Sequence, residues 1–113
     1  MRLSTHFTID EMSCRGEDCC GHSYPMSQYF MIILDLIREE AGGPVICTSG
    51  FRCRIHNAAE GGVENSFHTL GLAADLVPTT CSLEELKAIA DKYCSEVIMY
   101  EEKGFVHVAN PIW

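Results

Sequence analysis

Residues 48–77, TSGFRCRIHNAAEGGVENSFHTLGLAADLV, contain the motif around which the rest of the chain is organised. His68 is followed seven positions later by Asp75, and most residues between them are small or apolar. A second informative histidine, His107, lies near the C-terminus in the β-like run FVHV. Two imidazoles and one carboxylate, with a fourth position left open, are a known ligand set of catalytic zinc. The sequence therefore predicts one zinc ion bound by these three side chains.

The surroundings of Asp75 strengthen this prediction. It lies in the apolar run AADLV, which has the composition of a buried strand and ends at Pro78. An unpaired carboxylate is costly to bury there, so a cation or a good hydrogen-bond donor must compensate it. His107 raises the same question between two valines. A single histidine in such a place is more often a hydrogen-bonded core residue. Two histidines together with an aspartate in an apolar strand favour a metal site instead.

Hydrophobic periodicity predicts both helices and strands. Helical patterns cover residues 8–12, 25–41, 54–59 and 82–94. Strand-like runs cover residues 45–48, 73–77, 96–100 and 105–109. Thr8 with Glu11, and Ser82 with Glu85, form capping boxes, and Pro25 is expected in the first turn of the second helix. The order predicts an α+β fold, in which a small, mostly antiparallel sheet has helices packed on one side.

Size and charge exclude several classes of protein. The chain has 113 residues, so we expect residues 1–113 to form a single domain. Its net charge of −8 argues against a nucleic-acid partner, which requires a basic surface, and offers no polybasic patch to an anionic membrane. The longest apolar run, residues 29–34, is far too short to cross a bilayer. We expect a monomer with neither nucleic acid nor membrane as a partner.

The N-terminal segment MRLSTHFTIDEMS lacks the apolar middle region of a secretory signal. We therefore expect the protein to be made and retained in the cytoplasm unless something else releases it.

Seven cysteines are many for this length, and Cys14, Cys19, Cys20 and His22 are four zinc-competent side chains within nine positions. Their spacing fits no standard zinc knuckle, and the adjacent pair Cys19-Cys20 is an awkward donor geometry. We therefore expect a loop with one cysteine packed into the core, in preference to a second, structural zinc ion.

Three segments, SGFRCRIHN, GGVENSFHTLGLAADL and GFVHVAN, resemble the zinc D-Ala-D-Ala carboxypeptidase and peptidoglycan endopeptidase family. The resemblance covers most of the chain, and many bacterial and phage members are short single domains. It implies the fold shared by hedgehog domains and DD-peptidases, and it implies that His68, Asp75 and His107 bind zinc. Arg52 would contact the substrate carboxylate or the developing oxyanion, and Ser66 would line the site and donate a hydrogen bond. The substrate implied is a peptide bond of bacterial peptidoglycan.

The chain departs from the family pattern at the catalytic carboxylate, which normally lies three residues before the last histidine. Gly104 occupies that position here. Glu101 and Glu102 on the preceding turn are the expected replacements for the general base, and Glu96 is a third candidate if the last two strands pair as a hairpin. The departure keeps a second hypothesis open: a zinc-containing binding module with weak or no catalysis, associated with a phage tail or the cell wall.

Overall fold

The computed structural model describes residues 2–17, 19–61 and 66–110. The helices are α1 (Ile9–Met12), α2 (Gln28–Ala41), α3 (Arg54–Ala59), the 3₁₀ helix η1 (Phe67–Leu70) and α4 (Leu83–Asp91). The strands are β1 (Val45–Ser49), β2 (Ala73–Pro78), β3 (Glu96–Tyr100) and β4 (Phe105–Ala109). They form a four-stranded sheet in the order β1-β2-β4-β3, and every neighbouring pair is antiparallel. The predicted α+β class is confirmed.

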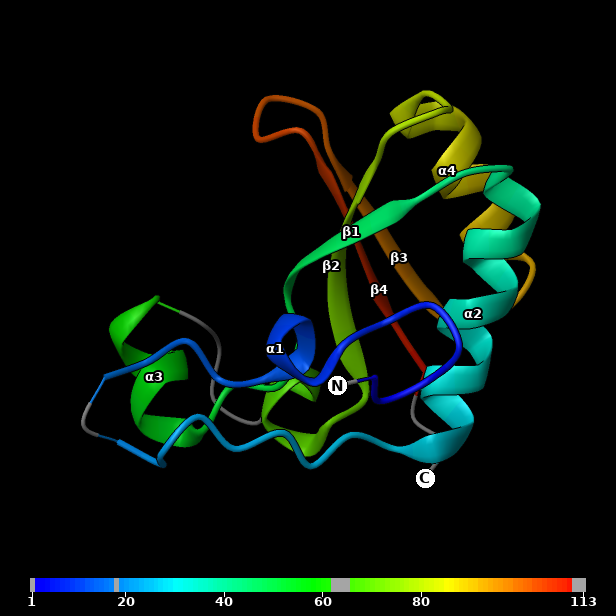
Figure 1. The fold of residues 1–113 in the computed structure, drawn as a ribbon. Coiled ribbons are helices and arrows are strands. Elements are labelled where there is room, and N and C mark those ends of the chain that lie inside the picture. Colours follow the sequence, from blue (N-terminus) through cyan, green and yellow to red (C-terminus); the bar gives the residue numbers. More distant parts are fainter. Residues whose placement is uncertain (1, 18, 62–65, 111–113) are drawn as a thin grey trace.

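Helices α2 and α4 lie side by side along one face of the sheet (Figure 1). The apolar stripe of α2 supplies Phe30, Leu34 and Ile37, all fully buried. They share one hydrophobic cluster with Leu76 of β2 and Val106 of β4. Because side chains alternate along a strand, burying these two positions turns their sequence neighbours to the opposite face of the sheet.

That opposite face carries the polar side chains. Asp75 precedes Leu76 and His107 follows Val106, so both lie on the face turned away from the two long helices. They are direct cross-strand partners in the β2–β4 pairing. Glu96 and Ile98 of β3 lie on this same face. Ile98 is the cross-strand partner of His107 in the β3–β4 pairing, and Glu96 lies two residues before Ile98. The sheet thus separates an apolar core from a polar surface.

Two capping boxes confirm the predicted helix starts. The side chains of Thr8 and Ser82 each accept a hydrogen bond from the backbone N–H of the glutamate three residues later. The carboxylate of that glutamate in turn accepts one from the backbone N–H of the cap residue. The predicted start of α2 is wrong, because Ser27 caps the helix by accepting from the Phe30 N–H at 3.3 Å. Pro25 consequently lies before the helix and not in its first turn.

The end of α4 and the conformation of residues 67–70 also differ from the sequence prediction. Helix α4 ends at Asp91, three residues earlier than expected, and a turn follows it. Residues Phe67–Leu70 form η1, where the sequence indicated only a loop. Within the described ranges, none of the helices has the length and apolar character needed to cross a bilayer.

Candidate metal centre

Three predicted ligands converge on the polar face of the sheet. Asp75 comes from β2, His107 from β4, and His68 from η1, which packs against β2. One donor atom from each side chain lies within 4.8 Å of the others. The imidazole ring centroids of the two histidines are 5.2 Å apart. The structure therefore brings together the three side chains that the sequence singled out.

The orientation of His68 is fixed by the loop that follows β1. Its Nδ1 lies 2.8 Å from the carbonyl oxygen of Gly50, and the imidazole is buried. A carbonyl oxygen only accepts, so Nδ1 carries the proton and Nε2 is turned towards Asp75, with 3.4 Å between Nε2 and Oδ1. In a neutral His68, Nε2 would thus direct a lone pair at the Asp75 carboxylate, and the two would repel each other. A cation, or a second proton on Nε2, removes this repulsion. Sequence reasoning missed Gly50, whose contribution is a backbone carbonyl.

Asp75 is 5% exposed and is surrounded by cationic or donor groups. Burial by itself disfavours its charged form, but hydrogen bonds to His107 and His68 outweigh burial and lower the pKa of Asp75 to about 2. The distance between His107 Nδ1 and Asp75 Oδ1 is 3.1 Å. The carboxylate is therefore ionised at neutral pH and available to a cation.

Arg52 and Ser66 lie beside this group, as the sequence predicted. The Arg52 guanidinium donates to Oδ2 of Asp75 at 3.4 Å and to Oγ of Ser49 at 3.1 Å. The backbone N–H of Arg52 also donates to the carbonyl oxygen of His68 at 3.1 Å. Ser66 caps η1, and its hydroxyl accepts from the His68 N–H at 3.2 Å. Both residues contact the candidate metal ligands or their backbone, and their roles towards a substrate remain predictions.

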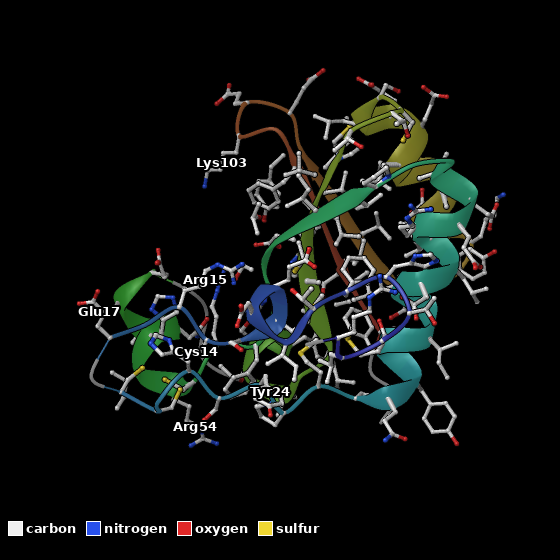
Figure 2. The ribbon with its side chains drawn as sticks, in the orientation of Figure 1. Cys14, Arg15, Glu17, Tyr24, Arg54 and Lys103 are labelled. Carbon is white, nitrogen blue, oxygen red and sulfur yellow. The ribbon has the colours of Figure 1, made fainter. Side chains whose placement is uncertain are left out.

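An open pocket of about 470 Å³ contains the three convergent side chains. Glu96 lines this pocket, and its Oε2 lies 3.6 Å from Nε2 of His107. Glu101 and Glu102 are exposed on the turn between β3 and β4 and are not among the residues that line the pocket. Lys103 lies on the same turn (Figure 2) and is among the residues that line the pocket. The antiparallel register thus brings Glu96, rather than the two turn glutamates, to the pocket.

The turn also explains the glycine at the position of the family's carboxylate. Gly104 has φ of 78°, a left-handed conformation that costs L-residues energy, and its N–H donates to the Tyr100 carbonyl at 2.8 Å. A glutamate or aspartate would be strained there, so the turn as folded disfavours a carboxylate at this position.

The donor set fits zinc. Two imidazole nitrogens and one ionised carboxylate suit zinc, and the pocket leaves room for a further ligand. The fold and this group together define a small α+β protein with side chains suited to a metal ion.

Comparison with known families agrees with this class. A family model described as Peptidase M15 matches residues 5–109, and the chain therefore belongs to the peptidase M15 family. The family is one of zinc peptidases, and the two histidines and the aspartate are residue types that such a site uses. No curated protein matches the chain.

Proposed function

We propose that the protein is a zinc metallopeptidase that hydrolyses peptide bonds in bacterial peptidoglycan, as a D-Ala-D-Ala carboxypeptidase or as an endopeptidase. The observation that carries this proposal is the convergence of His68, Asp75 and His107 in an open pocket of a peptidase M15 chain. When bound there, zinc would supply a Lewis acid that acidifies water to a pKa of about 7 and polarises a carbonyl.

The chain's own residues hold the donor atoms ready. The Gly50 carbonyl fixes the tautomer of His68, so that Nε2 faces the ion. Nδ1 of His107 faces Asp75, while its Nε2 faces Glu96. A hydrogen bond such as that between His68 and the Gly50 carbonyl orients a ligand and raises its basicity. The site is therefore built on a strand pair and a capped helical turn, which are rigid elements.

Arg52 is the group best placed to recognise negative charge. Its guanidinium has five donors, and the structure assigns some of them to Asp75 and Ser49. A third contact runs from Nη1 to Oδ1 of Asn57 at 3.5 Å, and because Arg52 lines the pocket, its guanidinium could also meet a substrate carboxylate or a developing oxyanion. Ser66 also lines the pocket, and its hydroxyl would donate a hydrogen bond to the peptide.

Three carboxylates are candidates for the general base. We place Glu96 first because it lines the pocket, whereas Glu101 and Glu102 project from the turn. A general base must come within hydrogen-bond reach of its proton, directly or through one water. Glu96→Gln should lower kcat and remove the acidic limb of the pH–rate profile, with zinc retained. If Glu96 only orients His107, the variant should instead lose zinc affinity by about 10–100-fold. A loss of activity in Glu101→Gln or Glu102→Gln, with normal turnover in Glu96→Gln, would assign the base to the turn.

A second candidate function rests on one specific observation. Gly104 stands where the family has its catalytic carboxylate, and its left-handed backbone makes a replacement strained. The protein would then be a zinc-containing module that binds the cell wall, or assembles with a phage tail, without cutting. Such a module would retain zinc and bind peptidoglycan but release no peptide fragment or D-alanine.

The deciding experiment measures zinc content and the products released from purified peptidoglycan fragments. Release of D-alanine indicates carboxypeptidase action, and opened cross-bridges indicate endopeptidase action. His68→Ala should lose both zinc at this site and all cleavage. His6→Ala is the matched control, because His6 lies outside the pocket and pairs with Glu39. Normal turnover by His68→Ala would refute the proposal.

A further inference from the structure

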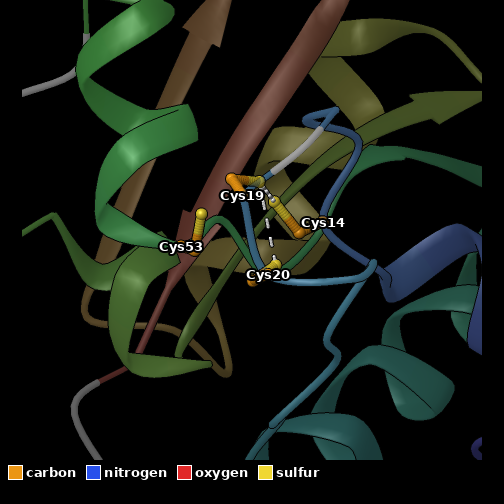
Figure 3. A group of neighbouring side chains, drawn as sticks. All are labelled: Cys14, Cys19, Cys20 and Cys53. Atoms are coloured by element: carbon orange, nitrogen blue, oxygen red, sulfur yellow. Dashed lines mark hydrogen bonds between the residues drawn. The ribbon is translucent and has the colours of Figure 1, made fainter.

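Four cysteine side chains gather away from the sheet, at the end of the molecule that carries α3. Cys14, Cys19 and Cys20 come from the loop that follows α1, and Cys53 is the N-cap residue of α3 (Figure 3). Their four sulfur atoms all lie within 4.8 Å of one another. The group shares no residue with the His/Asp/His group.

We propose that these four cysteines bind a structural zinc ion. The Sγ atoms of Cys14 and Cys19 are 4.0 Å apart, and those of Cys19 and Cys20 are 3.9 Å apart. Tetrahedral zinc with Zn–S bonds of about 2.3 Å requires sulfurs separated by about 3.8 Å. A disulfide requires about 2.05 Å. These two separations are close to the edge length of a four-thiolate tetrahedron, and the other sulfur pairs lie within 4.8 Å.

The sequence-based objection to this site does not hold in the structure. Adjacent Cys19 and Cys20 direct their sulfurs to the same centre, although they are neighbours in the chain. His22 is not part of the group, whose four members are all cysteines. Cys53 takes the fourth place, from a segment 33 residues beyond Cys20. Spacing within the loop alone could not have identified this ligand.

Backbone groups around the cluster suit thiolates. The Ser23 N–H donates to Sγ of Cys20 at 3.4 Å, and the His56 N–H donates to Sγ of Cys53 at 3.4 Å. Hydrogen bonds to a ligating sulfur favour its charged form and fix its direction. Gly16 leaves the room that the cluster needs, since a Cβ there would approach Sγ of Cys19 to 2.8 Å and Cβ of His56 to 2.9 Å.

The site has a structural task in this fold. The loop from Cys14 to Met26 contains no described helix or strand, and a small domain with a limited core gains stability from a metal that joins distant segments. The ion would tie this loop to Cys53, the residue next to Arg52. Arg52 in turn donates to Asp75 and to the His68 carbonyl oxygen. Through Cys53 and Arg52, the four thiolates would therefore also stabilise the wall of the pocket. The cluster itself is distant from the hairpin end of the pocket, because Figure 2 shows Cys14 well separated from Lys103.

The test counts zinc per chain in protein purified under reducing conditions with zinc present. The wild type should bind two zinc ions, and the His68→Ala/His107→Ala variant should bind one. Cys19→Ser/Cys20→Ser should also bind one and should lose several degrees in Tm. Cys81→Ser is the matched control, because Cys81 is a partly exposed cysteine outside the cluster, and it should still bind two.

A spectroscopic measurement keeps the proposal testable if the double serine variant does not fold. X-ray absorption of the zinc-loaded His68→Ala/His107→Ala variant should give four sulfur neighbours at about 2.3 Å. A shell of nitrogen and oxygen would overturn the proposal. So would loss of all zinc from that variant, or disulfides among the four cysteines in freshly purified reduced protein. Because this variant lacks the pocket ligands, the outcome is independent of peptidase activity.

Discussion

Replacing Asp75 by asparagine in the zinc-free protein tests the electrostatics of the pocket. The carboxylate has an ordinary pKa of 3.8, which the folded chain lowers to about 2. Each pKa unit corresponds to about 1.36 kcal/mol, so folding favours the ionised form by about 2.5 kcal/mol. Asparagine resembles the protonated carboxyl group in shape and lacks its charge. Asp75→Asn should therefore lower the free energy of unfolding by about 2 kcal/mol at pH 7.

The pH dependence has a definite sign. A carboxylate whose pKa is lowered by folding stabilises the protein above its unfolded pKa, and this stabilisation disappears as the pH falls through the folded pKa. The difference between wild type and Asp75→Asn should thus be full at about pH 5 and above and should shrink between about pH 4 and about pH 2.

The assay is urea unfolding of chelator-treated protein under reducing conditions across this pH range. Asp91→Asn is the matched control, because Asp91 is an exposed residue paired with Lys87 at 2.9 Å, and such pairs contribute at most about 1 kcal/mol. Equal stability of wild type and Asp75→Asn at about pH 7, or a difference that persists unchanged at about pH 2.5, would refute the reasoning.

Three further predictions concern the pocket and its support. Arg52→Gln should lower kcat by about 10²–10³-fold with zinc content unchanged, while the exposed Arg54→Gln should keep normal kinetics; equal rates for both variants would remove Arg52 from the mechanism. Gly71→Ala should destabilise the fold well beyond Gly61→Ala in urea unfolding. Both glycines have φ of 72°, which costs an L-residue about 1–2 kcal/mol, but only at Gly71 would the new Cβ collide with the backbone carbonyl of Pro25. Equal losses would show that the close approach of Pro25 does not restrict this position. Chelation should abolish cleavage of peptidoglycan fragments, and added zinc but not magnesium should restore it, because magnesium prefers oxygen ligands; full activity in chelator would exclude a metal.

The pattern of the sequence was sufficient for the α+β class and for the approximate position of each strand. Asp75 in an apolar strand and His107 between valines each indicated a polar residue that needs a partner. The observed β2–β4 register places both on one face and makes them direct cross-strand partners, which the sequence pattern did not predict. Glu96 was expected on the same face if the hairpin formed, and the β3–β4 pairing confirms this.

The remaining features depend on contacts between distant segments. Cys53 completes its cluster only because α3 folds against the loop after α1, and no local spacing encodes that approach. The Gly50 carbonyl that orients His68 is a backbone group, which residue types do not identify. The start of α2 was predicted too early because Pro25 was expected in the first turn. Ser27 is the N-cap, since its hydroxyl accepts a hydrogen bond from the Phe30 N–H.

The most direct test of the central claim is an anomalous-difference map at the zinc edge from crystals grown with zinc. The account predicts a peak about 2.0–2.2 Å from Nε2 of His68, Nδ1 of His107 and one carboxylate oxygen of Asp75. The claim would be contradicted by zinc-saturated crystals that show no peak between these three side chains.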